Sequence, residues 1–156
     1  MDANGQRPRP VLTVVRGVPG SGKTTWAKAT GRLVLENDMF HMAGGKYLWD
    51  ARRMKDAIAW CMETAERTLS AGMDVVVANT FTKARHVRAY EALAARAGAG
   101  FEVVRCEGRF GSVHAVPEAT LRSMESGFED WPGEKIVVNG RPDGETSGPK
   151  PGIIPA

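Results

Sequence analysis

Eight residues near the N-terminus constrain the fold of this chain more than any other feature. Residues 17–24 read GVPGSGKT, a complete match to the pattern G-x-x-x-x-G-K-[ST]. Glycines at these positions let the backbone fold into a nest whose N–H groups point at phosphate oxygens. A β-branched run over residues 11–16 precedes the pattern, and a helix is predicted to begin at about Lys23. This strand–loop–helix context predicts that the chain binds a nucleoside triphosphate.

The chemistry of that loop assigns a role to each polar residue in it. Lys23 is expected to reach the β- and γ-phosphates of ATP, and the Thr24 hydroxyl is expected to ligate the Mg²⁺ that accompanies the nucleotide. The predicted cofactors are therefore ATP and Mg²⁺. The residues predicted to contact the nucleotide are Gly17, Pro19, Gly20, Ser21, Gly22, Lys23, Thr24 and Thr25.

Short apolar runs alternate with helical patterns along the rest of the chain. The predicted strands cover residues 11–16, 32–36, 74–78, 101–106 and 134–138. The predicted helices cover residues 50–71 and 84–97 and run from 117 to about 127. This alternation predicts an α/β fold of the P-loop NTPase class, with a parallel sheet between two layers of helices.

Length and composition favour one domain in a reducing compartment. The chain has 156 residues, and we expect a tail over residues 1–10, a domain over 11–138 and a flexible tail rich in glycine and proline over 139–156. Cys61 and Cys106 are the two cysteines, which predicts neither a disulfide framework nor a CxxC site and fits the cytoplasm. No apolar run approaches the roughly 20 residues that span a bilayer, so no membrane partner is expected.

The phosphate loop alone does not reveal what happens to the nucleotide. The guanine motif N-K-x-D of signalling GTPases is absent, and the third predicted strand leads into Asn79 rather than a carboxylate. A short chain with one such loop and a candidate lid favours phosphoryl transfer to an acceptor.

Transfer to a hydroxyl requires a carboxylate that accepts its proton in line with the γ-phosphate. Asp38 follows the second predicted strand, and strand ends in a parallel sheet share one edge with the phosphate loop. Glu36 is the weaker competitor for this role. The alternative is that Asn37 and Asp38 only form a turn.

Candidate cations flank a predicted lid over residues 111–117. Arg109 and Arg122 lie on either side of it, and either could stabilise the transferring phosphoryl group or simply be solvated. A basic stretch that includes aromatic residues suits a nucleic-acid 5′ end, and a solvated helix start is its alternative. That stretch contains Lys46, Tyr47, Trp49, Arg52, Arg53 and Lys55.

Three segments of the chain resemble bacteriophage-type polynucleotide 5′-hydroxyl kinases, within the wider P-loop kinase or AAA-like ATP-binding family. Residues 19–27, PGSGKTTWA, resemble the phosphate loop of these kinases, and residues 89–98 resemble their third helix. The AVP of residues 115–117 with the LRSM of 121–124 is similar to their lid helix. The resemblance extends over about residues 11–129.

This resemblance implies a sheet with strand order 2-3-1-4-5 and transfer of the ATP γ-phosphate to the 5′-hydroxyl of DNA or RNA, as in nucleic-acid repair. It implies that Lys23 orients the phosphate, Thr24 serves Mg²⁺ and Asp38 is the general base. The chain departs from the family pattern in having Asn79 in place of an aspartate and His41 in place of an arginine. Gly111 stands where the family has its lid arginine, and Arg109 is the nearest substitute.

Two other functions stay open at this stage. The chain could phosphorylate a different hydroxyl, in a modified base, a nucleoside or a small metabolite. It could also be an ATP-binding module that regulates a partner without transfer. The sequence leaves the oligomeric state undetermined.

Overall fold

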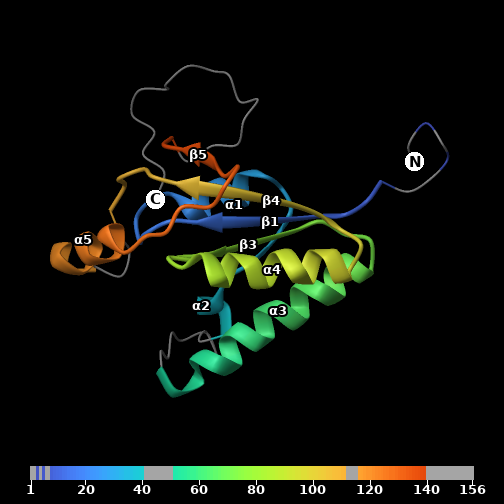
Figure 1. The fold of residues 1–156 in the computed structure, drawn as a ribbon, viewed down its shortest axis with the longest axis horizontal. Coiled ribbons are helices and arrows are strands. Elements are labelled where there is room, and N and C mark those ends of the chain that lie inside the picture. The colour runs from blue at the N-terminus through green and yellow to red at the C-terminus, as the bar shows by residue number, and fades with distance from the viewer. Residues whose placement is uncertain (1–2, 4, 6–7, 41–50, 112–115, 140–156) are drawn as a thin grey trace.

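The centre of the fold is a five-stranded sheet with order β2-β3-β1-β4-β5, in which each neighbouring pair is parallel (Figure 1). The computed structural model describes residues 3, 5, 8–40, 51–111 and 116–139. The strands are β1 (Val11–Arg16), β2 (Leu33–Leu35), β3 (Val75–Asn79), β4 (Gly100–Cys106) and β5 (Lys135–Val137). The predicted fold class and strand order are thus confirmed.

Helices cover both faces of this sheet. The helices are α1 (Lys23–Ala29), α2 (Asn37–Phe40), α3 (Met54–Ser70), α4 (Ala84–Arg96) and α5 (Glu118–Ser126), and a 3-10 turn, η2 (Ala51–Arg53), precedes α3. Helices α3 and α4 contact the sheet and each other on one face, and α1 packs on the opposite face. This is the layered arrangement that parallel strands with crossover helices produce.

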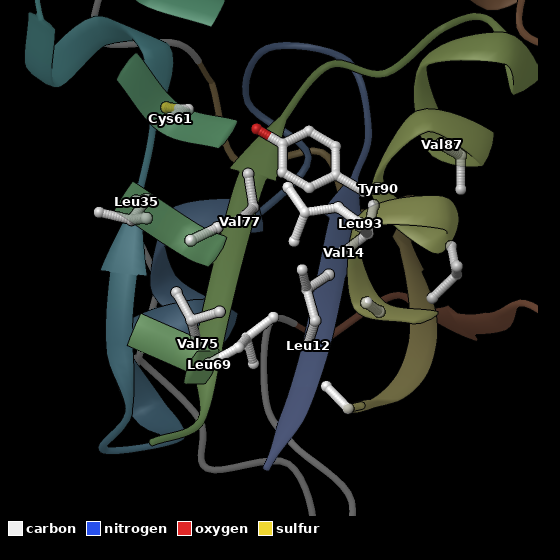
Figure 2. Packing of buried hydrophobic residues seen from close by; sticks show 14 of the residues in the cluster. Leu12, Val14, Leu35, Cys61, Leu69, Val75, Val77, Val87, Tyr90 and Leu93 are labelled. Carbon is white, nitrogen blue, oxygen red and sulfur yellow. The ribbon is translucent and has the colours of Figure 1, made fainter. Parts of the chain in front are cut away.

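Strand β1 shows why the strand sequences are apolar throughout. Leu12 and Val14 belong to the core beneath α3 and α4 (Figure 2), whereas Val15 belongs to the core beneath α1. All three side chains are fully buried, and each such burial contributes about 1.5–3 kcal/mol. A strand with helices on both faces has no solvated side, so its sequence is a continuous apolar run.

The carboxyl ends of three strands meet at one edge of the sheet. Arg16 at the end of β1 pairs in register with Asn79 of β3 and with Arg105 of β4. The loop over residues 17–22 leaves β1 at this edge, and α5 lies just beyond it (Figure 1). Residues that are far apart in the sequence are therefore gathered around the glycine-rich loop.

The observed elements differ from the predicted ones mainly at their ends. The helix predicted over residues 50–71 begins as the turn η2 and becomes α-helical at Met54. The short helix α2 was not predicted, because its four residues are too few to show a periodicity. His41, the aromatic part of the basic stretch at 46–49, positions 112–115 of the predicted lid and the tail over 140–156 lie outside the described residues.

Candidate functional site

The loop over residues 17–22 is tied to the strand ends on both sides of β1. The Gly17 N–H donates to the Thr80 carbonyl at 3.2 Å, which joins the loop to the segment after β3. The Gly108 N–H donates to the Ser21 carbonyl at 3.1 Å, which joins the loop to the segment after β4. The sheet edge thus holds the loop from two directions.

Glycine is required at several positions of this loop. Gly20 and Gly22 have φ angles of 81° and 97°, in the left-handed region that other residues avoid. At Gly17 a Cβ atom would lie 2.3 Å from Ser21 Oγ and 2.6 Å from the Cys106 carbonyl oxygen, closer than atoms can approach. The pattern of glycines is therefore a consequence of the loop conformation.

Two observations test whether this loop fits a phosphate group. The loop is too tight for a side chain at Gly17, and such close packing of the backbone is typical of a nest for an anion. The Ser21 hydroxyl is buried and has no hydrogen-bond partner within the part of the chain that the structure describes. A buried polar group without a hydrogen-bond partner destabilises the protein. A ligand that orders the loop can remove this cost by giving the hydroxyl a partner. The residues present fit a triphosphate.

Lys23 lies against the loop with its ammonium in a partly desolvated position. Its Nζ donates to the Val18 carbonyl at 3.1 Å. Burial lowers the pKa of Lys23 below its usual value, and electrostatic interactions with Cys106, Glu36 and Asp38 offset part of that shift. Glu36 and Asp38 are thus the carboxylates whose charges act on the pKa of Lys23 beside the loop.

Glu36 contacts a residue that the phosphate-loop pattern singles out. The Thr24 Oγ1 hydroxyl donates to Glu36 Oε1 at 2.8 Å. Glu36 was predicted only as a competing base, and its contact with Thr24 was not predicted. The signal that could have revealed this contact is the position of Glu36 directly after β2, at the same sheet edge as the loop.

Asn79 anchors the segment that carries Asp38. The Asn37 N–H donates to Asn79 Oδ1 at 2.8 Å, and Asn79 Nδ2 donates to Asn37 Oδ1 at 3.3 Å. Asn37 begins α2, and Asp38 is its second residue, with an exposed side chain. The end of β3 thus positions the start of α2 through a neutral amide.

The two lid arginines occupy different environments. Arg109 lines a pocket of about 260 Å³ between the loop, the segment after β4 and α5, and it pairs with Glu125 of α5 at 3.4 Å. Arg122 lies on the exposed surface of α5 and does not line this pocket. The full lining of the pocket is Gly17, Val18, Arg105, Cys106, Glu107, Gly108, Arg109, Glu125 and Phe128.

Arg16 is the most deeply buried charge of this edge. Its guanidinium donates to the Phe81 carbonyl at 3.1 and 2.6 Å and to Glu134 at 2.9 Å, and it is fully buried. Phe81 has a φ of 50°, so its carbonyl is presented from an unusual left-handed conformation. This network holds the segment after β3 to the one before β5.

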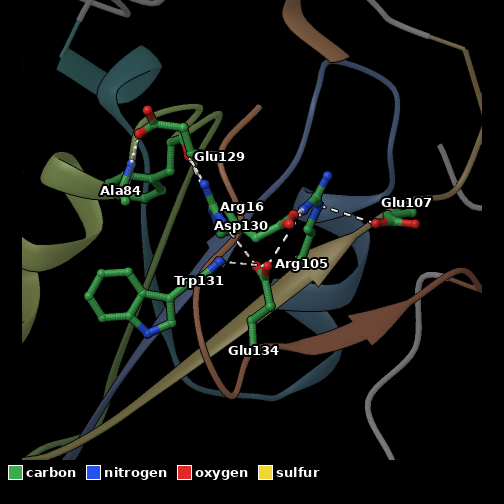
Figure 3. Close-up of polar contacts among 9 residues, drawn as sticks. Arg16, Ala84, Arg105, Glu107, Glu129, Asp130, Trp131 and Glu134 are labelled. Atoms are coloured by element: carbon green, nitrogen blue, oxygen red, sulfur yellow. Dashed lines mark hydrogen bonds and ion pairs between the residues drawn. The ribbon is translucent and has the colours of Figure 1, made fainter. Parts of the chain in front are cut away.

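Arg105 extends the same network toward the surface. It pairs with Asp130 at 2.6 Å and with Glu107 at 3.2 Å (Figure 3). The guanidinium groups of Arg16 and Arg105 each lie over the Phe128 ring, at 4.4 and 4.3 Å from its centre. These strand arginines are thus engaged within the protein, and the sequence analysis did not foresee their partners.

A family model described as an AAA domain matches residues 12–109, which include the loop, Glu36, Asp38, Asn79 and Arg109. This chain belongs to the AAA_33 family. Within the residues that the structure describes, the AAA_33 chain has no helix whose length and apolarity would allow it to cross a membrane.

Solved structures similar to this AAA_33 chain include several kinases. A candidate kinase from Chloroflexus aurantiacus is 22% identical with a TM-score of 0.65, and the match covers 85% of this chain and 89% of that one. The APS kinase CysC of Mycobacterium tuberculosis is 20% identical with a TM-score of 0.53, with 76% and 69% covered. A chain of the Pnkp1/Rnl/Hen1 RNA repair complex is 17% identical with a TM-score of 0.57, with 85% and 43% covered. At these identities the likeness establishes the P-loop kinase fold.

Proposed function

We propose that this AAA_33 domain is an ATP-dependent kinase that transfers the γ-phosphate of ATP to the 5′-hydroxyl of DNA or RNA. The observation that carries the proposal is that the Lys23 ammonium lies against the glycine-rich loop, where it donates to the Val18 carbonyl, and that the charges of Glu36 and Asp38 raise its pKa against the effect of burial. An ammonium that binds phosphate and a carboxylate that accepts a proton are the two groups that phosphoryl transfer to a hydroxyl needs.

The residues divide the work of binding and transfer. The loop amides and Lys23 bind the β- and γ-phosphates, and Thr24 would hold Mg²⁺. When bound, Mg²⁺ neutralises charge on the phosphate oxygens. Asp38 accepts the proton of the attacking hydroxyl as the new O–P bond forms and the bond to the ADP oxygen breaks. Arg109, at the rim of the pocket, balances charge on the transferring group.

The choice of a polynucleotide acceptor rests on sequence likeness and charge. Residues 19–27 and 115–124 resemble the phosphate loop and lid of polynucleotide 5′-hydroxyl kinases. Arg52 in the turn η2 and Lys55 in the first turn of α3 are exposed and basic, which suits a nucleic-acid backbone. The RNA repair complex among the structural neighbours agrees with this choice.

The test is transfer of labelled phosphate from γ-labelled ATP to a panel of acceptors. A 5′-hydroxyl single strand, a nicked duplex and an RNA strand should become labelled. The matched 5′-phosphorylated oligonucleotides should not, because they lack the acceptor group. Labelling of a nucleoside or a small metabolite with no labelling of any oligonucleotide would instead identify a kinase for another hydroxyl.

One structural feature favours a second candidate, an ATP-binding module without transfer. The side chain of Arg109 is 76% exposed and pairs with Glu125, so this candidate lid cation is not buried over the loop. ATP binding with no labelled product from any acceptor would support this candidate and contradict the kinase proposal.

A further inference from the structure

The Thr24 hydroxyl is oriented by a single carboxylate. A threonine hydroxyl has one proton to donate and two lone pairs that can accept a hydrogen bond or ligate a cation. In this structure the proton is donated to Glu36 Oε1 at 2.8 Å. Both lone pairs of Thr24 Oγ1 are therefore turned away from Glu36 and are available to a cation.

The end of β3 supplies no negative charge to this place. Asn79 is neutral, and its amide oxygen and nitrogen are both engaged with Asn37, at 2.8 and 3.3 Å. Glu36 lies at the end of the neighbouring strand β2, and β2 and β3 are paired in parallel. The carboxylate of Glu36, at the end of β2, thus lies at the same sheet edge as Asn79 at the end of β3.

The negative charge of Glu36 lies beside the Thr24 hydroxyl. Its carboxylate accepts the hydrogen bond of the Thr24 hydroxyl at 2.8 Å, so it lies directly beside that group. The side chain is half-buried, where a negative charge is screened less than at the surface. Such a charge attracts a divalent cation and repels a bare triphosphate.

We propose that Glu36 is the carboxylate of the Mg²⁺ site of this protein. It fixes the Thr24 proton away from the metal and adds the negative charge that the end of β3 lacks. Asn79 serves instead as a positioning residue for the turn that carries Asp38. This inference rests on the proposed nucleotide-dependent function, because the metal arrives with ATP.

The experiment measures binding of a non-hydrolysable ATP analogue by calorimetry, with and without Mg²⁺. Glu36→Gln keeps an acceptor for the Thr24 hydroxyl but removes the charge. We expect this variant to lose about 10–100-fold of the Mg²⁺-dependent gain in affinity. Its affinity for the metal-free analogue should be unchanged or higher, because repulsion of the phosphates is relieved. Glu91→Gln, at an exposed position of α4, is the matched control and should behave as wild type.

A second variant tests the strand-end argument. Asn79→Asp in the Glu36→Gln background returns a carboxylate to the same edge and should restore part of the Mg²⁺-dependent gain. If Glu36→Gln does not fold, as judged by circular dichroism, Glu36→Ala is measured in its place with the same expectation for Mg²⁺.

The outcomes separate this inference from the function on which it rests. A Mg²⁺-dependent gain in Glu36→Gln equal to that of wild type would overturn the role of Glu36 while leaving the kinase proposal intact. A wild-type protein that binds no analogue, with or without Mg²⁺, would overturn the proposed function and this inference together.

Discussion

Arg16 and Glu134 form an ion pair at 2.9 Å in which the arginine side chain is fully buried and the glutamate is 7% exposed. The residues are separated by 118 positions in the sequence, and they join the end of β1 to the segment before β5. Glu134 also accepts the Trp131 N–H at 2.9 Å and pairs with Arg105 at 3.5 Å, so its carboxylate has three partners (Figure 3).

Replacing Arg16 should therefore destabilise the protein strongly. In Arg16→Met, Glu134 and the Phe81 carbonyl lose their buried partner, and we expect a loss of about 3–5 kcal/mol in the free energy of unfolding. Urea denaturation followed by circular dichroism measures this change. The matched control is Arg96→Met, which breaks the exposed pair with Glu66 and should cost about 1 kcal/mol or less. Equal losses in the two variants would contradict this interpretation.

Replacing Lys23 should stabilise the protein in the absence of nucleotide. Burial lowers the pKa of Lys23 in the folded state, so folding is opposed by the cost of holding its charge out of water. Lys23→Met should raise the melting temperature at pH 7 while removing binding of an ATP analogue. At neutral pH the variant keeps this higher melting temperature, because Lys23 of the wild type is protonated there in both the folded and the unfolded state.

The pH dependence of that difference has a definite sign. Between the lowered pKa of folded Lys23 and the ordinary value of 10.5, the unfolded wild-type chain binds more protons than the folded one. Wild-type stability therefore rises with pH relative to Lys23→Met, and the gap between their melting temperatures should narrow as the pH approaches 10. A gap that widens would show that the burial of Lys23 is not the cause.

Both cysteine thiols should resist alkylation in the folded protein. Burial raises the pKa of Cys61 to about 12 and that of Cys106 to about 11, and the thiolate is the reactive form. Mass spectrometry after iodoacetamide treatment at pH 8 should find neither cysteine modified, whereas the urea-denatured chain should be modified at both. Rapid labelling of Cys106 in the folded state would mean that the pocket it lines is more open than the structure shows.

Gly17→Ala should damage the phosphate loop. The added Cβ would overlap Ser21 Oγ and the Cys106 carbonyl oxygen, and relief of such overpacking costs about 1–3 kcal/mol. Because the added Cβ destabilises the loop conformation that binds the nucleotide, we expect the affinity for an ATP analogue to drop by roughly 10–100-fold. Gly127→Ala, where the backbone φ is −95° and a Cβ makes only ordinary contacts at 3.6 and 3.7 Å, is the control and should bind the analogue as wild type does. Wild-type affinity in Gly17→Ala would contradict the assignment of this loop.

The fold could be predicted because its signals are local. The pattern of residues 17–24 and the apolar runs such as 11–16 indicate a strand, a loop and a helix in order, and the alternation along the chain indicates a parallel sheet. The helix predicted to begin at about Lys23 is an example, since it is observed as α1 and its Trp26 is buried in the core against the sheet.

The contacts of the site could not be predicted in the same way. The hydrogen bond between Thr24 and Glu36 joins the start of α1 to the end of β2 across 12 positions, and that between Asn37 and Asn79 joins the start of α2 to the end of β3 across 42. Which side chains meet there depends on strand register and on where each strand stops, and periodicity fixes neither to within one residue. The roles of Lys23, Thr24, Asp38, Arg109 and Arg122 in catalysis stay predictions.

The account depends most on Asp38 acting as the proton acceptor beside a loop that holds ATP. The decisive measurement compares wild type and Asp38→Asn for transfer of labelled phosphate to a 5′-hydroxyl oligonucleotide, with the affinity of each for an ATP analogue measured in parallel. We expect the rate of Asp38→Asn to fall by at least about 100-fold, the usual contribution of a general base, while its affinity for the analogue stays near that of wild type. A rate within a few-fold of wild type would contradict the account.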